Sequence, residues 1–61
     1  MSIAARDWVR VFSESEGSYI ERMVTEVCTR DGATLYRIDG FGKLKTAAEL
    51  TLTWRWNGKA V

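Results

Sequence analysis

Few side chains in this 61-residue chain belong to the types that carry catalysis or bind metals. The sequence contains no histidine and a single cysteine, Cys28. A zinc site of the usual ligands therefore cannot be assembled within one chain. Cys28 stands among apolar residues, which is typical of a buried structural thiol and not of a nucleophile. The serines occupy expected caps and turns without a base at a recognisable spacing, so we expect no enzyme, no metal and no cofactor.

Binding chemistry is better represented, and it gathers in the second half of the chain. Basic side chains there are interleaved with aromatic ones, a combination that can contact phosphates and stack on bases. The candidate nucleic-acid-binding residues are Arg37, Lys43, Lys45 and Arg55. Residues 32–61 nevertheless hold only five basic and two acidic side chains, a net charge of +3. That density is low for a dedicated nucleic-acid-binding protein, so this function is the alternative and not the first choice.

The most regular pattern of the chain is an alternation near its end. Leu50, Leu52, Trp54 and Trp56 are separated by polar residues, and this period of two predicts a strand over residues 50–56 with one apolar face. We expect Trp54 to close the core and Trp56, at the end of the strand, to lie exposed. Exposed aromatic residues beside arginine are enriched at protein interfaces. The expected partner-binding residues are Trp56, Arg55, Lys59 and Phe41.

The segment over residues 18–30 shows the spacing of an amphipathic helix. Apolar pairs recur every four residues with polar pairs between them, which predicts one dry and one wet helical face. Ser18 and Glu21 match the capping-box pattern, and Asp31-Gly32 can end the helix. The β-branched residues inside the segment weaken this prediction slightly.

The preceding residues are ambiguous between two structures. Ala5, Trp8 and Phe12 form a helical stripe, whereas Val9 and Val11 alternate with their neighbours as in a strand. We favour a short helix here. After Gly32 the period changes to two, which predicts a strand over residues 33–38 followed by a glycine-rich turn at 39–43.

The expected fold is α+β, with one or two N-terminal helices packed on a two- to three-stranded antiparallel sheet. Residues 1–61 have room for one small globular domain, and such a chain buries only about 60% of its unfolded surface. The expected core is Trp8, Phe12, Ile20, Val24, Val27, Leu35, Ile38, Leu50, Leu52 and Trp54. The lone cysteine favours a cytoplasmic protein, and the sequence shows neither a signal peptide nor a membrane-spanning run.

These observations favour a non-enzymatic protein-binding module as the function. Very short domains without cofactors are often inhibitors or adaptors, including those that phages and mobile elements carry against host or defence proteins. We expect the partner to be another protein, with a homodimer through the sheet edge as a further possibility. A small nucleic-acid-binding or regulatory protein that uses the basic C-terminal half is the alternative.

Overall fold

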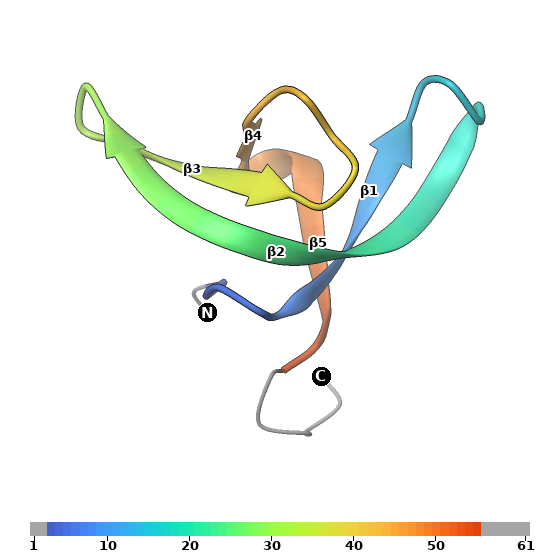
Figure 1. Ribbon diagram of the computed structural model, residues 1–61, viewed down its shortest axis with the longest axis horizontal. Coiled ribbons are helices and arrows are strands. Elements are labelled where there is room, and N and C mark those ends of the chain that lie inside the picture. Colours follow the sequence, from blue (N-terminus) through green and yellow to red (C-terminus); the bar gives the residue numbers. More distant parts are fainter. Residues whose placement is uncertain (1–2, 56–61) are drawn as a thin grey trace.

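The computed structural model describes residues 3–55 and consists of one antiparallel sheet of five strands, in the order β4-β3-β2-β1-β5 (Figure 1). Its elements are β1 (Trp8–Ser13), β2 (Ser18–Arg30), β3 (Ala33–Ile38), β4 (Lys45–Thr46), the 3-10 turn η1 (Ala47–Glu49) and β5 (Leu50–Trp54). The described residues contain no α-helix. The expected α+β fold, with helices packed on a two- to three-stranded sheet, was therefore wrong.

The predicted helix over residues 18–30 is instead the long strand β2. It pairs with β1 along its first half and with β3 along its second half, so both neighbours supply backbone partners. Asp31 and Gly32 link β2 to β3 as a two-residue hairpin, with φ of 51° and 79°. Asp-Gly is a strong signal for this kind of hairpin because both central residues need positive φ. The same dipeptide is also common at the end of a helix, so it agreed with the wrong prediction of a helix over residues 18–30.

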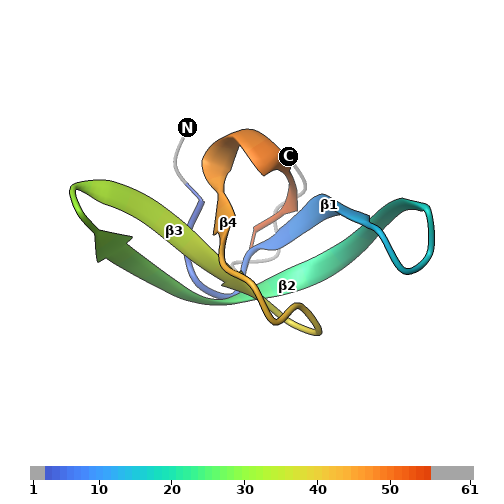
Figure 2. The same cartoon turned by 90° about the horizontal axis from the view of Figure 1, so that it is seen from above.

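The strand β2 serves two hairpins because it bends at Val24 and Thr25. The pairing with β3 shifts between Val24 and Glu26, so Thr25 is the extra residue of a β-bulge. The Thr25 hydroxyl donates a hydrogen bond of 3.2 Å to the carbonyl oxygen of Arg37. Beyond this bend the β1–β2 and β2–β3 hairpins point away from each other (Figure 2). The bulge thus turns one long strand into the curved spine of the sheet.

A second shift in the pairing register, between β1 and β5, places the Trp54 side chain on the opposite face of the sheet. Val9 lies opposite Leu52, whereas Trp8 lies opposite Trp54, which leaves Thr53 as the extra residue. The Thr53 hydroxyl donates to the carbonyl oxygen of Trp8 over 3.1 Å. One added residue moves every following side chain to the opposite face. Trp54 therefore leaves the apolar face of Leu50 and Leu52 and joins the outer face, so its predicted core position was wrong.

The core lies on the inner face of the curled sheet. Its buried members come from four strands and are Val9, Val11, Val24, Tyr36, Ile38 and Leu50, with Ile3, Ile20, Phe41 and Leu52 packed against them. The prediction was correct for Ile20, Val24, Ile38, Leu50 and Leu52. It was wrong for Trp8, Phe12, Val27 and Trp54, which are exposed, and Leu35 does not join the buried cluster.

The short helix that we favoured ahead of residue 18 is wrong, because Trp8–Ser13 form the strand β1. Val9, Val11 and Ser13 of β1 are buried while Trp8 and Phe12 are exposed, which is the alternation of a strand with one inner face. The strand predicted over residues 33–38 is confirmed as β3. The strand predicted over residues 50–56 is confirmed as far as Trp54, and Trp56 lies outside the described residues.

The geometry of the Asp31-Gly32 turn predicts that Gly32 cannot be replaced without a loss of stability. A Cβ at Gly32 would meet no neighbouring atom, but the φ of +79° is strained for any residue with a side chain. Gly32→Ala should therefore destabilise the protein by about 1–2 kcal/mol, measured by thermal or urea unfolding. Gly42→Ala is the matched control, because that site is equally open and its φ lies outside the left-handed region. Equal losses in both variants would contradict the two-residue hairpin.

Candidate functional site

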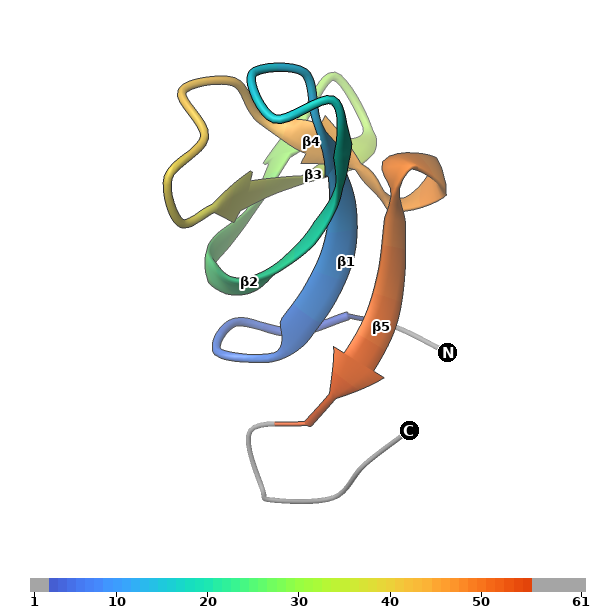
Figure 3. The same cartoon turned by 90° about the vertical axis from the view of Figure 1, so that its right-hand side faces the viewer.

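Two large aromatic side chains lie side by side on the outer face of the sheet. Trp8 begins β1 and Trp54 ends β5, and the two are cross-strand partners. Trp8 is 39% exposed and Trp54 is 44% exposed. Together with Glu21 and Thr53 they line a shallow hollow of about 350 Å³. We call these four residues the tryptophan patch. Thr53 and Trp54 of the patch belong to β5, the edge strand that pairs with β1 (Figure 3).

A buried carboxylate fastens the two strands next to the tryptophan patch. The Asp7 side chain is 3% exposed, and its Oδ2 accepts hydrogen bonds from Arg55 Nη1 at 3.2 Å and from the Ala4 amide at 2.9 Å. Asp7 precedes Trp8 and Arg55 follows Trp54, so this ion pair holds both tryptophans in register. Removing one partner of a largely buried charge pair is costly because the other group is left buried without its partner, whereas an exposed pair contributes little. Arg55, predicted to bind a partner or nucleic acid, thus contributes to the fold.

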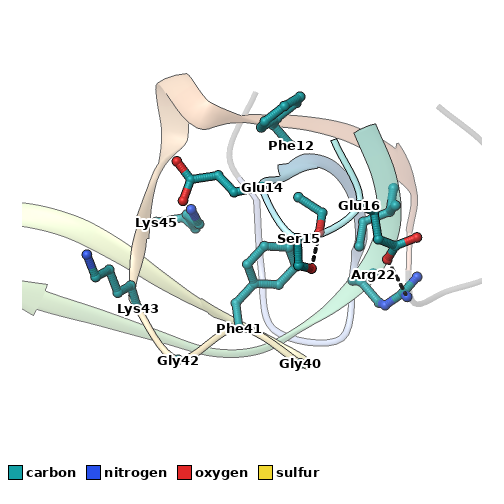
Figure 4. A pocket seen from close by; sticks show the side chains of 12 residues that line it. Phe12, Glu14, Ser15, Glu16, Arg22, Gly40, Phe41, Gly42, Lys43 and Lys45 are labelled. Atoms are coloured by element: carbon teal, nitrogen blue, oxygen red, sulfur yellow. Dashed lines mark hydrogen bonds and ion pairs between the residues drawn. The ribbon is translucent and has the colours of Figure 1, made fainter. Parts of the chain in front are cut away.

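The second hollowed region crosses the other end of β1, between the β1–β2 turn and the loop from β3 to β4 (Figure 4). Two adjoining hollows of about 340 and 480 Å³ share the residues Phe12, Glu14, Lys43 and Lys45. We call them together the end groove, whose further aromatic members are Phe41 and Tyr19.

The aromatic rings of the end groove are held by contacts to their neighbours. Phe12 packs edge-to-face against Tyr19 with ring centroids 5.3 Å apart. The Nζ atom of Lys45 lies 5.3 Å from the centroid of the Phe41 ring, within the range of a cation–π contact. Phe41 also packs against the core. These contacts limit the freedom of the rings before anything binds, which lowers the entropy cost of binding.

Most charged groups around the end groove are paired. Lys45 lies 3.8 Å from Glu49, and Arg22 lies 4.0 Å from Glu16. Hydrogen bonds from the backbone N–H and the hydroxyl of Thr46, together with the charge of Lys45, hold the pKa of Glu49 below its ordinary value. The carboxylate of Glu49 therefore stays ionised and fixes the turn η1 along the rim of the groove.

The candidate nucleic-acid-binding residues do not form one patch. Arg37 pairs with Glu26 at 3.3 Å, Lys45 pairs with Glu49, and Arg55 pairs with Asp7. Only Lys43 and Lys45 are brought together, in the end groove. Three of the four cations are thus already neutralised by carboxylates, which weakens their attraction for phosphates.

The predicted partner-binding residues are not brought together either. Phe41 lines the end groove near the last residues of β1, whereas Arg55 is bonded to Asp7, which lies just before β1 begins. Trp56 and Lys59 lie outside the described residues. Trp8, which was expected in the core, belongs to the tryptophan patch instead, and its alternation with Val9 and Val11 was the signal that could have placed it on the outer face.

Residues 3–55 hold one free thiol and no cluster of metal-binding side chains. No group of three or more histidine, cysteine, aspartate or glutamate side chains there could hold a metal ion. Cys28 is a half-buried free thiol. No helix in this range is long and apolar enough to cross a membrane. Comparisons with family models, with curated proteins and with solved structures found no match to this chain, so function must be argued from geometry.

The buried carboxylate of Asp7 should contribute far more to the free energy of unfolding than an exposed carboxylate does. Asp7→Ala leaves the Ala4 amide and the guanidinium of Arg55 without this acceptor, so we expect a loss of about 2–3 kcal/mol in the free energy of unfolding. Glu26→Ala removes the exposed pair with Arg37 and should cost less than about 1 kcal/mol. Urea unfolding of both variants measures the difference. Similar losses would show that the Asp7 pair does not hold the fold.

Acidic pH should weaken the turn η1. Because the pKa of Glu49 is lowered on folding, its contribution to stability is complete above the ordinary glutamate pKa and is lost as the pH falls through the lowered value. An NMR titration of the Glu49 carboxyl should give a lower pKa in the wild type than in Thr46→Val, which lacks the donating hydroxyl. Identical titration curves would exclude a contribution from that hydroxyl.

Proposed function

We propose that the protein is a non-enzymatic binding module, an inhibitor or adaptor that contacts another protein through the tryptophan patch. The observation that carries the proposal is the exposure of Trp8 and Trp54 as adjacent cross-strand partners. A domain with so small a core leaves two of its largest apolar side chains in water. Rigid tryptophans at a sheet surface give a large contact area at a low cost in conformational entropy, as interface anchors do.

The neighbouring edge strand supports the same proposal. Among the described strands β5 pairs only with β1, so its other side offers backbone donors and acceptors next to Trp54. An extended segment can add to such an edge while its side chains reach the patch. A second copy of this chain is one candidate for that segment. The opposite edge, β4, has only two residues and offers little to pair with.

Nucleic-acid binding has weaker support. The argument in its favour is that Lys43 and Lys45 lie together beside aromatic rings. The argument against it is that Lys45, Arg37 and Arg55 are all engaged by carboxylates. We propose the cytoplasm as the place of action because the lone Cys28 is a free thiol, which a reducing compartment keeps reduced.

Trp54→Ala should weaken partner binding without unfolding the protein. We expect a loss of about 2 kcal/mol or more in binding, as for interface anchors, and a small change in melting temperature because Trp54 is already exposed. Affinity capture from nuclease-treated lysate, followed by mass spectrometry, compares the wild type with this variant. Val27→Ala is the control, because Val27 is similarly exposed but lies on the second half of β2.

The outcomes separate the two functions. A protein captured by the wild type and by Val27→Ala, but not by Trp54→Ala, supports the tryptophan patch. Capture that is lost on nuclease treatment, and that falls steeply with rising salt, would favour nucleic-acid binding because counterion release makes phosphate contacts salt-sensitive. Equal capture by Trp54→Ala and the wild type would show that the patch is not the binding surface.

A further inference from the structure

The tryptophan patch has a chemical character beyond its apolar area. Its hollow is lined by two indole rings, by Glu21 with its carboxylate and by Thr53 with its hydroxyl. None of these four side chains is basic. The faces of indole rings carry partial negative charge and attract cations. The hollow therefore combines two rings that attract a cation with a carboxylate of the opposite charge.

The two rings belong to a row of side chains across three strands. Trp8 lies opposite Trp54 of β5 on one side and opposite Met23 of β2 on the other. Side chains of cross-strand partners share one face of a sheet. Met23 is half-buried, whereas both tryptophans are exposed. The strand pairing thus fixes the backbone at each ring while ring surface stays open to a ligand.

Glu21 adds a carboxylate that forms no ion pair with another residue of the described chain. Its side chain is exposed. The cross-strand neighbour of Glu21 is Arg10, which is not among the residues that line the hollow. Arg22 donates to the carbonyl oxygen of Glu21 and pairs with the carboxylate of Glu16. The carboxylate of Glu21 is therefore open to a cation from another molecule.

The remaining polar side chain of the hollow also suits a cation. The Thr53 hydroxyl donates its hydrogen to the carbonyl oxygen of Trp8 over 3.1 Å, so it can only accept a hydrogen bond from a ligand. An anion in the hollow would be repelled by the carboxylate of Glu21. An uncharged apolar group would cover that carboxylate without replacing its water, which costs free energy.

Arginine fits this hollow better than lysine does. The guanidinium group is planar, stacks on aromatic faces and donates hydrogen bonds in a fork that matches a carboxylate. The ammonium group of lysine is a compact and more strongly hydrated charge. The hollow is shallow, so a flat group that stacks on a ring can still direct its N–H groups to Glu21.

We propose that the tryptophan patch binds an arginine side chain of the partner protein. The guanidinium group stacks on an indole ring and donates hydrogen bonds to the carboxylate of Glu21, and the Thr53 hydroxyl can accept a further one. This inference rests on the proposed function, because it names the group that the partner places on the patch. It gives Glu21 a role in recognition that apolar contact area alone does not require.

An NMR titration of the full chain with N-acetylarginine amide tests the proposal. This probe should shift the indole N–H signals of Trp8 and Trp54, and the shifts should saturate. The uncharged N-acetylcitrulline amide has nearly the same shape and should bind at least about fivefold more weakly. The corresponding lysine amide should also bind more weakly than the arginine probe. No saturable shift, or equal binding of the arginine probe and either control ligand, would overturn the proposal.

Two variants with the same change of charge locate the contact. Glu21→Gln should weaken binding of the arginine probe at least about fivefold, and its melting temperature should stay close to that of the wild type because the side chain is exposed. Glu14→Gln is the matched control, because Glu14 is also exposed and forms no ion pair within residues 3–55, but it lines the end groove. Equal weakening in both variants would contradict a contact at Glu21.

Capture from lysate separates this inference from the proposed function. A partner that Trp54→Ala and Glu21→Gln both lose, and that the arginine probe displaces from the wild type, supports both. A partner that Trp54→Ala loses but Glu21→Gln retains in full would leave the proposed function standing and overturn the arginine contact. Equal capture by Trp54→Ala and the wild type would overturn the proposed function, and the titration alone would then decide whether the patch binds arginine.

Discussion

The bend of β2 at Val24 is the constraint on which the rest of the structure depends. The described chain has no α-helix or second sheet to cover an apolar face, so the sheet must curl onto itself to form a core. Val24 is fully buried at the bend. Its N–H donates to the Asp7 carbonyl at 2.8 Å and its C=O accepts from the Arg6 N–H at 2.7 Å, so the segment before β1 is bonded to the spine at that point. The curvature lets residues of β1, β2, β3 and β5 meet in one set of buried side chains on the inner face.

The sequence predicted those parts of the fold that depend on local alternation. β3 and the first residues of β5 follow a period of two, which a single strand encodes by itself. β2 does not, because the bulge at Thr25 interrupts the alternation and leaves apolar pairs that imitate a helix. Whether such a segment becomes a strand depends on the backbone partners beside it. The tertiary structure supplies those partner strands, and their pairing with β2 overrides the helix-like pattern of its sequence.

The candidate surfaces were harder to predict for a related reason. Nothing in the spacing of Leu50, Leu52 and Trp54 shows that Thr53 is an extra residue in the pairing, yet that one residue moves a tryptophan from the core to the surface. Arg55 looked like a free interface cation because its carboxylate partner lies 48 residues earlier. Phe41 and Lys43, both predicted as binding candidates, line the end groove, but the β1–β2 turn that lines it with them is distant in sequence. A local pattern identifies residue types that bind, and long-range pairing decides which of them meet.

The antiparallel pairing of β1 with β5 also has a mechanical consequence. The chain enters β1 at Trp8 and leaves β5 at Trp54, and these residues are opposite each other. Tension applied to the two ends of the chain would open this pair from one end and peel it apart bond by bond, instead of shearing all its hydrogen bonds at once. The Asp7–Arg55 ion pair and the hydrogen bonds between residues 6–7 and Val24 lie at the end where β1 and β5 would begin to separate, so they would break first. A pull on the ends of the chain would therefore separate β5 from β1 one hydrogen bond at a time, beginning at the Trp8–Trp54 pair.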